Sequence, residues 1–194
     1  MTTPVLPVAF YNRAPDVVAR ELLGALLVHE RRGVRCGGRI VETEAYFAHN
    51  DPACHTWRGK TRRNATMFGP PGRAYVYFCY GNHWLLNAVT EAEGTGSAVL
   101  IRALEPLYGM AQMERRRGGV RGYGLTNGPG KLCAALGITG RHNGVPLWEG
   151  ALRIHAPEHA PLPWQAGPRI GISAGTQLHA RFWVPGNPWV SRHA

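Results

Sequence analysis

Residues 73–91 read RAYVYFCYGNHWLLNAVTE, and this stretch decides the fold class. Two runs rich in aromatic and aliphatic residues, 73–80 and 84–91, flank Gly81-Asn82, a dipeptide typical of tight turns. The pattern predicts two strands joined as a hairpin. Strands joined by so short a turn must run antiparallel, because a parallel pair needs a long crossover connection. We therefore expect a largely antiparallel sheet.

Further elements are expected on both sides of this hairpin. Strand-like segments lie at 25–30, 38–46, 98–104, 168–173 and 180–185. Asp16 is expected to cap a short helix that stops near Gly24, and helices are expected over Leu107–Arg117 and from Pro129 to Gly137. Strands outnumber helices, so the predicted class is α+β.

The length of 194 residues fits one domain. Residues 1–14 are expected to form an N-terminal arm and residues 15–194 a single domain. Hydrophobic residues make up 44% of the chain and no apolar run is long enough for a membrane span, so the composition excludes a disordered chain and favours a protein without membrane segments. The N-terminal sequence MTTPVLPVAF lacks the features of a secretory signal, and an intracellular location is expected.

The charge is strongly and unevenly positive. Lysine and arginine number 22 against 12 acidic residues, which gives a formal net charge of +10. Two windows, 52–90 and 115–148, contain no acidic residue. Such a surplus favours a polyanionic partner, nucleic acid before a membrane surface.

The strand expected at 38–46, GRIVETEAY, carries two carboxylates. Regular alternation would place Ile40, Glu42, Glu44 and Tyr46 on one face, an arrangement that suggests the wall of a cleft. Glu42 and Glu44 would lie about 6.6 Å apart, a spacing within the range of the carboxylate pair of an inverting glycosidase. In a lone Glu-x-Glu pattern, however, one or both side chains more often point to solvent or pair with arginine.

Three other features admit both a functional and a structural interpretation. His49, Asp51 and His55 have a spacing that could ligate a metal, although such a loop is more often polar surface. Tyr80 precedes the Gly81-Asn82 turn, where an aromatic ring could act as a wedge between bases. Residues 127–131, NGPGK, resemble a helix N-terminus able to bind phosphate, or one that is simply capped.

Six blocks spread over most of the chain resemble the alkyladenine (3-methyladenine) DNA glycosylase family. They read GRIVETEAY, DPACHTWRGKTRRNATMFGPPGRAYVYFCYG, VLIRALEP, LTNGPGKLCAALGI, PRIGI and RFWVPGNPWVS. The resemblance implies one mixed domain on a curved antiparallel sheet, without a helix-hairpin-helix. It also implies excision of alkylated purines, and often hypoxanthine, from double-stranded DNA at the start of base excision repair. No cofactor, no metal and no obligatory protein partner are expected, and a monomer is expected.

The same resemblance implies the catalytic roles. Glu44 matches the family's general base and Arg102 the arginine that helps to hold the attacking water, with the main-chain carbonyl of Ile170 as a third water ligand. With water as the nucleophile, the expected enzyme is monofunctional and leaves an abasic site.

It implies the binding roles as well. Tyr46, His55 and Tyr77 match the residues that sandwich the extruded base. Tyr80 matches the residue that fills the gap left in the duplex. Asn87 corresponds to the asparagine that crowds the 2-amino group of guanine, and Lys131 would contact a backbone phosphate.

Two other functions stay open at this point. One is a metal-dependent nucleic-acid hydrolase that uses His49, Asp51 and His55. The other is a non-catalytic domain that binds damaged DNA.

Overall fold

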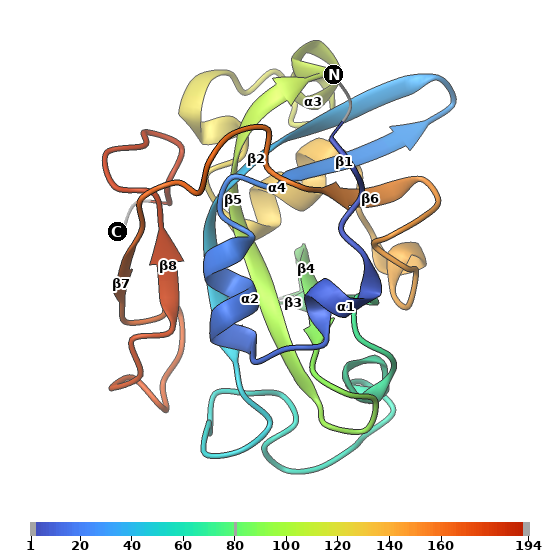
Figure 1. Cartoon of the computed structure of the whole chain (residues 1–194). Coiled ribbons are helices and arrows are strands. Elements are labelled where there is room, and N and C mark those ends of the chain that lie inside the picture. Colours follow the sequence, from blue (N-terminus) through green and yellow to red (C-terminus); the bar gives the residue numbers. More distant parts are fainter. Residues whose placement is uncertain (1–2, 80, 192–194) are drawn as a thin grey trace.

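The structure, a computed structural model, describes residues 3–79 and 81–191 (Figure 1). Its strands are β1 (Leu26–Arg31), β2 (Val34–Tyr46), β3 (Ala74–Cys79), β4 (His83–Thr90), β5 (Ser97–Tyr108), β6 (Leu152–His155), β7 (Gln165–Gly167) and β8 (Arg181–Trp183). Its α-helices are α1 (Val8–Tyr11), α2 (Pro15–Glu21), α3 (Met110–Arg116) and α4 (Pro129–Leu136). Single turns of 3-10 helix lie at Ala65–Phe68, Gly122–Leu125 and Gly140–His142.

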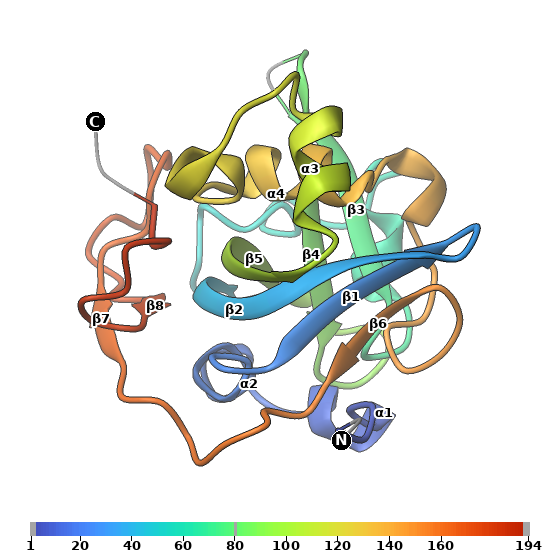
Figure 2. The same ribbon diagram turned by 90° about the horizontal axis from the view of Figure 1, so that it is seen from above.

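The strands form one curled antiparallel sheet, a half-barrel, with the order β3-β4-β5-β2-β1-β6. The long strand β2 lies at its centre. It pairs with β5 along one edge, and along the other edge it pairs first with β1 and then, over Glu42–Glu44, with the short strand β8. Seen from above, α3 and α4 lie on one side of β2 and β5, and α1 and α2 lie on the other (Figure 2). The predicted α+β class and antiparallel sheet are confirmed.

Helices α2 and α4 pack apolar side chains against the sheet. Leu22 at the C-cap of α2 and Leu132 and Leu136 from α4 are completely buried in the main core, together with strand residues such as Leu104. Helix α4 has proline at its first position and ends at Gly137, whose φ of +71° is the left-handed conformation that glycine adopts without strain. This element is as the sequence predicts.

The starts of two helices differ from the prediction. Ala14, not Asp16, occupies the N-cap of α2, and Asp16 instead pairs with Arg20 one turn later at 3.1 Å. Helix α3 begins only at Met110, because β5 continues to Tyr108 and Gly109 follows in a left-handed conformation.

A bulge in β2 corrects the predicted strand face. Ile40 pairs with Leu104 and Glu42 with the adjacent Ala103, so Val41 is inserted without a partner of its own. Ile40 consequently packs in the main core with Ala45, while Glu42, Glu44 and Tyr46 keep the opposite face. The regular alternation predicted for 38–46 is therefore wrong at Ile40 and correct from Glu42 onward.

The described part of the segment expected as an arm packs against the domain: Leu6 and Tyr11 are buried, and Val5 forms a bridge with His155. One predicted strand near the C-terminus is wrong. Residues 168–173 form a loop instead of a strand, because the pairing with β8 is made by residues 165–167.

Candidate active site

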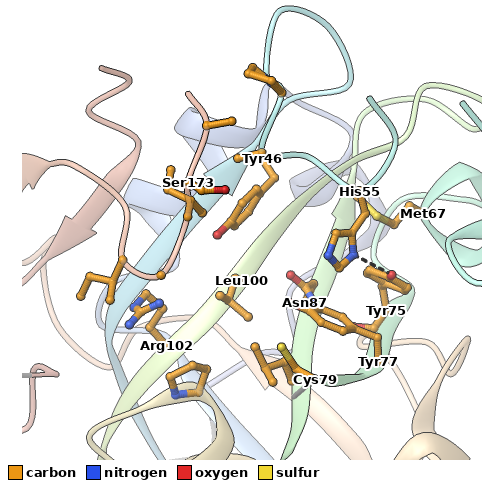
Figure 3. A pocket seen from close by; sticks show the side chains of 18 residues that line it. Tyr46, His55, Met67, Tyr75, Tyr77, Cys79, Asn87, Leu100, Arg102 and Ser173 are labelled. Carbon is orange, nitrogen blue, oxygen red and sulfur yellow. Dashed lines mark hydrogen bonds between the residues drawn. The ribbon is translucent and has the colours of Figure 1, made fainter. Parts of the chain in front are cut away.

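A cavity of about 460 Å³ opens beside the central strands of the sheet (Figure 3). Its walls come from β2, β3, β4 and β5, from loops around residues 52–55 and 170–174, and from Pro129 at the start of α4. Tyr75, Tyr77 and Cys79 alternate along β3 and therefore share one face, and all three line this cavity. Its volume is within the range of small-ligand sites.

Glu44 lies directly behind the cavity wall with its side chain 0% exposed. Its Oε1 accepts a hydrogen bond from the backbone N–H of Ile170 at 2.7 Å and lies 3.2 Å from Nη1 of Arg102. Its Oε2 accepts one from the hydroxyl of Tyr46 at 2.8 Å. These three donors compensate the burial of a carboxylate, and all three residues line the cavity.

Glu42 is equally buried, but its carboxylate binds a different set of partners. Its carboxylate contacts Nε of Arg102 at 3.0 Å and Nε of Arg181 at 2.7 Å, and it accepts hydrogen bonds from the backbone and the hydroxyl of Ser191 at 2.8 and 2.7 Å. These bonds tie the C-terminal segment to β2. Glu42 does not line the cavity, which disfavours its use as the second carboxylate of a glycosidase pair.

Arg102 joins the two carboxylates. Burial by itself would lower the pKa of its guanidinium, but the negative charges of Glu44 and Glu42 outweigh burial and raise that pKa. The group therefore stays cationic, lies 3.2 Å from Glu44 and lines the cavity, where Figure 3 labels it.

Aromatic rings form two walls that face each other across the cavity, with Tyr46 on one side and His55 and Tyr77 on the other (Figure 3). Tyr77 is stacked on Tyr75 with ring centroids 5.3 Å apart, and the ring of His55 meets Tyr77 edge-on at 4.5 Å. Nδ1 of His55 and the hydroxyl of Tyr75 are 2.9 Å apart. This wall is thus held by ring packing and one hydrogen bond.

The titratable groups of these walls are held neutral. His55 is exposed at the mouth, yet desolvation of its ring against the tyrosines, with Arg63 nearby, lowers its pKa. Burial raises the pKa of Tyr75 to about 12 and that of Tyr77 further. Burial, and then the charge of Glu44, raise the pKa of Tyr46. The cavity therefore presents uncharged aromatic surfaces at neutral pH.

Asn87 and Lys131 lie at different depths. Asn87 is buried on β4 beside Leu100, lines the cavity, and donates from Nδ2 to the backbone carbonyl of Tyr75 at 3.1 Å. Lys131 is exposed on α4, where its Nζ contacts Oδ1 of Asn127 at 2.9 Å. The wedge predicted at Tyr80 lies outside the described residues.

The residues of the metal hypothesis are not brought together. Asp51 is fully buried in a bidentate ion pair with Arg169, at 2.6 and 2.7 Å, and accepts hydrogen bonds from the backbone of Phe47 and Ala53. In residues 3–79 and 81–191, no three histidine, cysteine, aspartate or glutamate side chains are grouped so that they could hold a metal ion. His49 is exposed.

Sequence reasoning missed three residues that bind buried carboxylates, namely Arg169, Arg181 and Ser191. Each reaches its carboxylate from more than 100 residues away along the chain, so no local spacing could have revealed the pairs. The block PRIGI contains Arg169, but its pattern indicated only a strand.

The acid-free windows contain structural arginines as well as exposed ones. Arg73, Arg116 and Arg117 donate to backbone carbonyls of Gly144, Ala135 and Gly124. Lys60, Arg62 and Arg141 are exposed.

Among residues 3–79 and 81–191, every helix is too short or too polar to cross a membrane.

The sequence was compared with known proteins. Residues 9–188 match the family model described as methylpurine-DNA glycosylase (MPG). A putative 3-methyladenine DNA glycosylase of Methanoculleus marisnigri is 49% identical over 191 residues, covering 96% of this chain and 98% of the relative. Proteins of the same description from Burkholderia lata and Rhodopseudomonas palustris are 49% and 50% identical, and the aligned parts cover 96% and 97% of this chain and 91% and 92% of theirs.

Proposed function

The chain belongs to the methylpurine-DNA glycosylase family, and from this premise we propose how its residues excise a damaged purine. The protein is a DNA-3-methyladenine glycosylase, a hydrolase of N-glycosyl bonds that acts in base excision repair. Its substrate is damaged DNA.

The first step is extrusion of the damaged nucleotide. A base inside the duplex gives no access to its sugar carbon, so it must be flipped into the cavity at a cost of a few kcal/mol. Tyr80 would fill the gap in the stack, and Lys131 would contact a backbone phosphate from the exposed side of α4. Both contacts offset the cost of extrusion.

The second step is capture of the base between the two aromatic walls. A purine inserted between Tyr46 on one side and His55 and Tyr77 on the other would gain about 1–3 kcal/mol from stacking. An alkylated purine such as 3-methyladenine carries a positive charge and interacts more strongly with aromatic faces than a neutral base does. Asn87, buried beside the cavity, would crowd the 2-amino group of normal guanine.

The third step is hydrolysis. Positive charge develops on the sugar as the glycosidic bond stretches, and the carboxylate of Glu44 would stabilise it and accept a proton from water. Arg102 and the carbonyl of Ile170 would hold that water. In the free protein Tyr46 donates to Oε2 of Glu44, so a base that displaces the Tyr46 hydroxyl would free this oxygen for the water.

The buried carboxylate behind the aromatic cavity is the single observation that carries this mechanism. Glu44 is completely enclosed, yet Tyr46, Arg102 and Ile170, its three donors, all line the cavity.

A water nucleophile leaves an abasic site with an intact strand. The chain has only two lysines, Lys60 and Lys131, for the alternative attack by an amine, and Lys131 is assigned to phosphate.

The test uses duplexes that each carry one defined lesion, incubated with the protein with and without EDTA. We expect release of free 3-methyladenine at the same rate in both, and no covalent adduct after borohydride reduction. A robust adduct would refute the water mechanism. Release that stops in EDTA and returns with zinc or manganese would refute the metal-free role of Glu44.

A further inference from the structure

A buried ion pair lies directly behind the ring of Tyr46. Asp51 and Arg169 have fully buried side chains and meet in two hydrogen bonds of 2.6 and 2.7 Å. The central carbon of the Arg169 guanidinium lies 4.6 Å from the centroid of the Tyr46 ring. Tyr46 lines the cavity and Arg169 does not, so one ring face is covered by the cation while the ring is open to the cavity elsewhere.

The pair also holds the backbone on both sides of Tyr46. Arg169 donates from Nη1 to the carbonyl of Ala45 at 3.0 Å, and Asp51 accepts from the backbone N–H of Phe47 at 3.0 Å. The ion pair is closely packed on the side of Gly175, because a Cβ added there would lie 3.1 Å from Nη2 of Arg169 and 3.2 Å from Oδ1 of Asp51. Ring, guanidinium and carboxylate are thus fixed relative to one another.

The charge of this pair bears on the charge of the base. A cation behind an aromatic ring competes for the negative potential of the ring and repels a second cation stacked in front. Asp51 cancels that repulsion, because it supplies one negative charge in bidentate contact with Arg169. Without Asp51, the buried environment would leave the repulsion poorly screened.

We propose that Asp51 sets the charge preference of the cavity: by neutralising Arg169 it keeps the Tyr46 ring available to cationic alkylated purines. The inference rests on the proposed role of Tyr46 as a stacking surface. Asp51 and Arg169 act through Tyr46 and are positioning residues, since neither lines the cavity.

The test compares single-turnover rates on a duplex carrying cationic 7-methylguanine with those on duplexes carrying a neutral base, hypoxanthine or ethenoadenine. The measured quantity is the ratio of cationic to neutral excision, relative to the wild-type ratio. In Asp51→Asn, we expect the ratio to fall about thirtyfold, the size of a desolvated cation–π effect. The double variant Asp51→Asn/Arg169→Gln removes both charges and should return the ratio to within about twofold of wild type.

Asp51→Glu is the matched control, because it changes the side-chain length and keeps the charge. Its ratio should stay near that of the wild type even if both rates fall. Equal losses on cationic and neutral bases in Asp51→Asn, with an unchanged ratio, would mean that the pair only packs the loop and would overturn the proposal.

A second series leaves the ion pair intact and so does not depend on folding of the Asp51 variants. Phenylalanine and progressively fluorinated phenylalanines at position 46 weaken the negative potential of the ring step by step. The ratio of 7-methylguanine excision to neutral-base excision should fall along the series, whatever happens to the two separate rates, and an unchanged ratio would overturn the proposal. If Tyr46→Leu changes neither rate, the proposed stacking itself fails; if Glu44→Gln stays fully active, the proposed hydrolysis fails.

Discussion

The side chain of Tyr46 presents a ring and a hydroxyl, and the roles proposed for these two groups can be separated. Its ring faces the cavity, and its hydroxyl donates to Oε2 of Glu44 at 2.8 Å in the free protein. The raised pKa of this hydroxyl, caused mainly by burial and then by Glu44, keeps it protonated throughout the usual assay range. In the proposed mechanism, the hydroxyl shields the carboxylate until a base displaces it.

Substitution Tyr46→Phe tests this division. We expect excision of a cationic base to stay within about threefold of wild type, because the ring remains and water takes the vacated acceptor in the reactive complex. Tyr46→Leu should lose about a hundredfold, since the stacking surface is gone. Single-turnover rates on one lesion duplex measure both. A loss in Tyr46→Phe as large as that in Tyr46→Leu would show that the hydroxyl, not the ring, is what the reaction needs.

At the scale of single elements, strand β2 shows what the sequence could and could not predict. Alternation from Glu42 to Tyr46 and along Tyr75, Tyr77 and Cys79 is a local property, so these cavity-lining faces could be derived from spacing. The bulge at Val41 could not, because it depends on pairing with β5, more than 60 residues away. Nor could the Asp51–Arg169 pair, which only the folded loop 168–173 brings together.

Strand β2 packs so closely against β5 at Gly38 that a larger residue there should lower the free energy of unfolding. A Cβ at Gly38 would lie 2.2 Å from the carbonyl oxygen of Glu105 on β5, which is an impossible contact with backbone. Gly38→Ala should lower the free energy of unfolding by about 3 kcal/mol, at the upper end of overpacking effects. Gly124→Ala is the control, because its Cβ meets only Val120 at 3.6 Å and its φ is not positive. Urea unfolding should place the control within about 0.5 kcal/mol of wild type; equal stability of both variants would contradict the register.

At the scale of the whole molecule, two buried histidines tie stability to pH. His29 and His142 meet edge-to-face with ring centroids 4.8 Å apart, and burial is the largest cause of the lowered pKa of each. Below the ordinary histidine pKa of about 6.5, the unfolded chain binds protons that the folded protein refuses. Stability is therefore complete above this pH and is lost as pH falls below it, by at most about 1.4 kcal/mol per pH unit for each histidine.

His142→Gln tests this linkage while preserving the local structure. His142 closes a capping box with Thr139, a position where glutamine is also favoured. Melting temperatures between pH 7.5 and 5 should fall less steeply in His142→Gln than in wild type. The exposed His159→Gln is the control and should follow the wild-type curve. Parallel curves for all three proteins would show that the pKa values of the two buried histidines do not change on unfolding.

Strand β2 carries two buried carboxylates, and Arg102 contacts both of them. The two carboxylates differ in their other partners. Glu42 is bound to Arg181 and Ser191 away from the cavity, whereas the donors of Glu44 form the cavity wall. Glu42→Gln and Glu44→Gln are therefore a matched pair of isosteric changes on one strand. Glu42→Gln should reduce stability and keep most of the activity.

The most direct measurement is the single-turnover rate of 3-methyladenine release by these two variants, with melting temperature as the check on folding. We predict that Glu44→Gln loses about 10²–10⁴-fold in rate while it still binds the lesion duplex, which is the range for removing a general base. A folded Glu44→Gln protein that releases the base as fast as wild type would contradict the account.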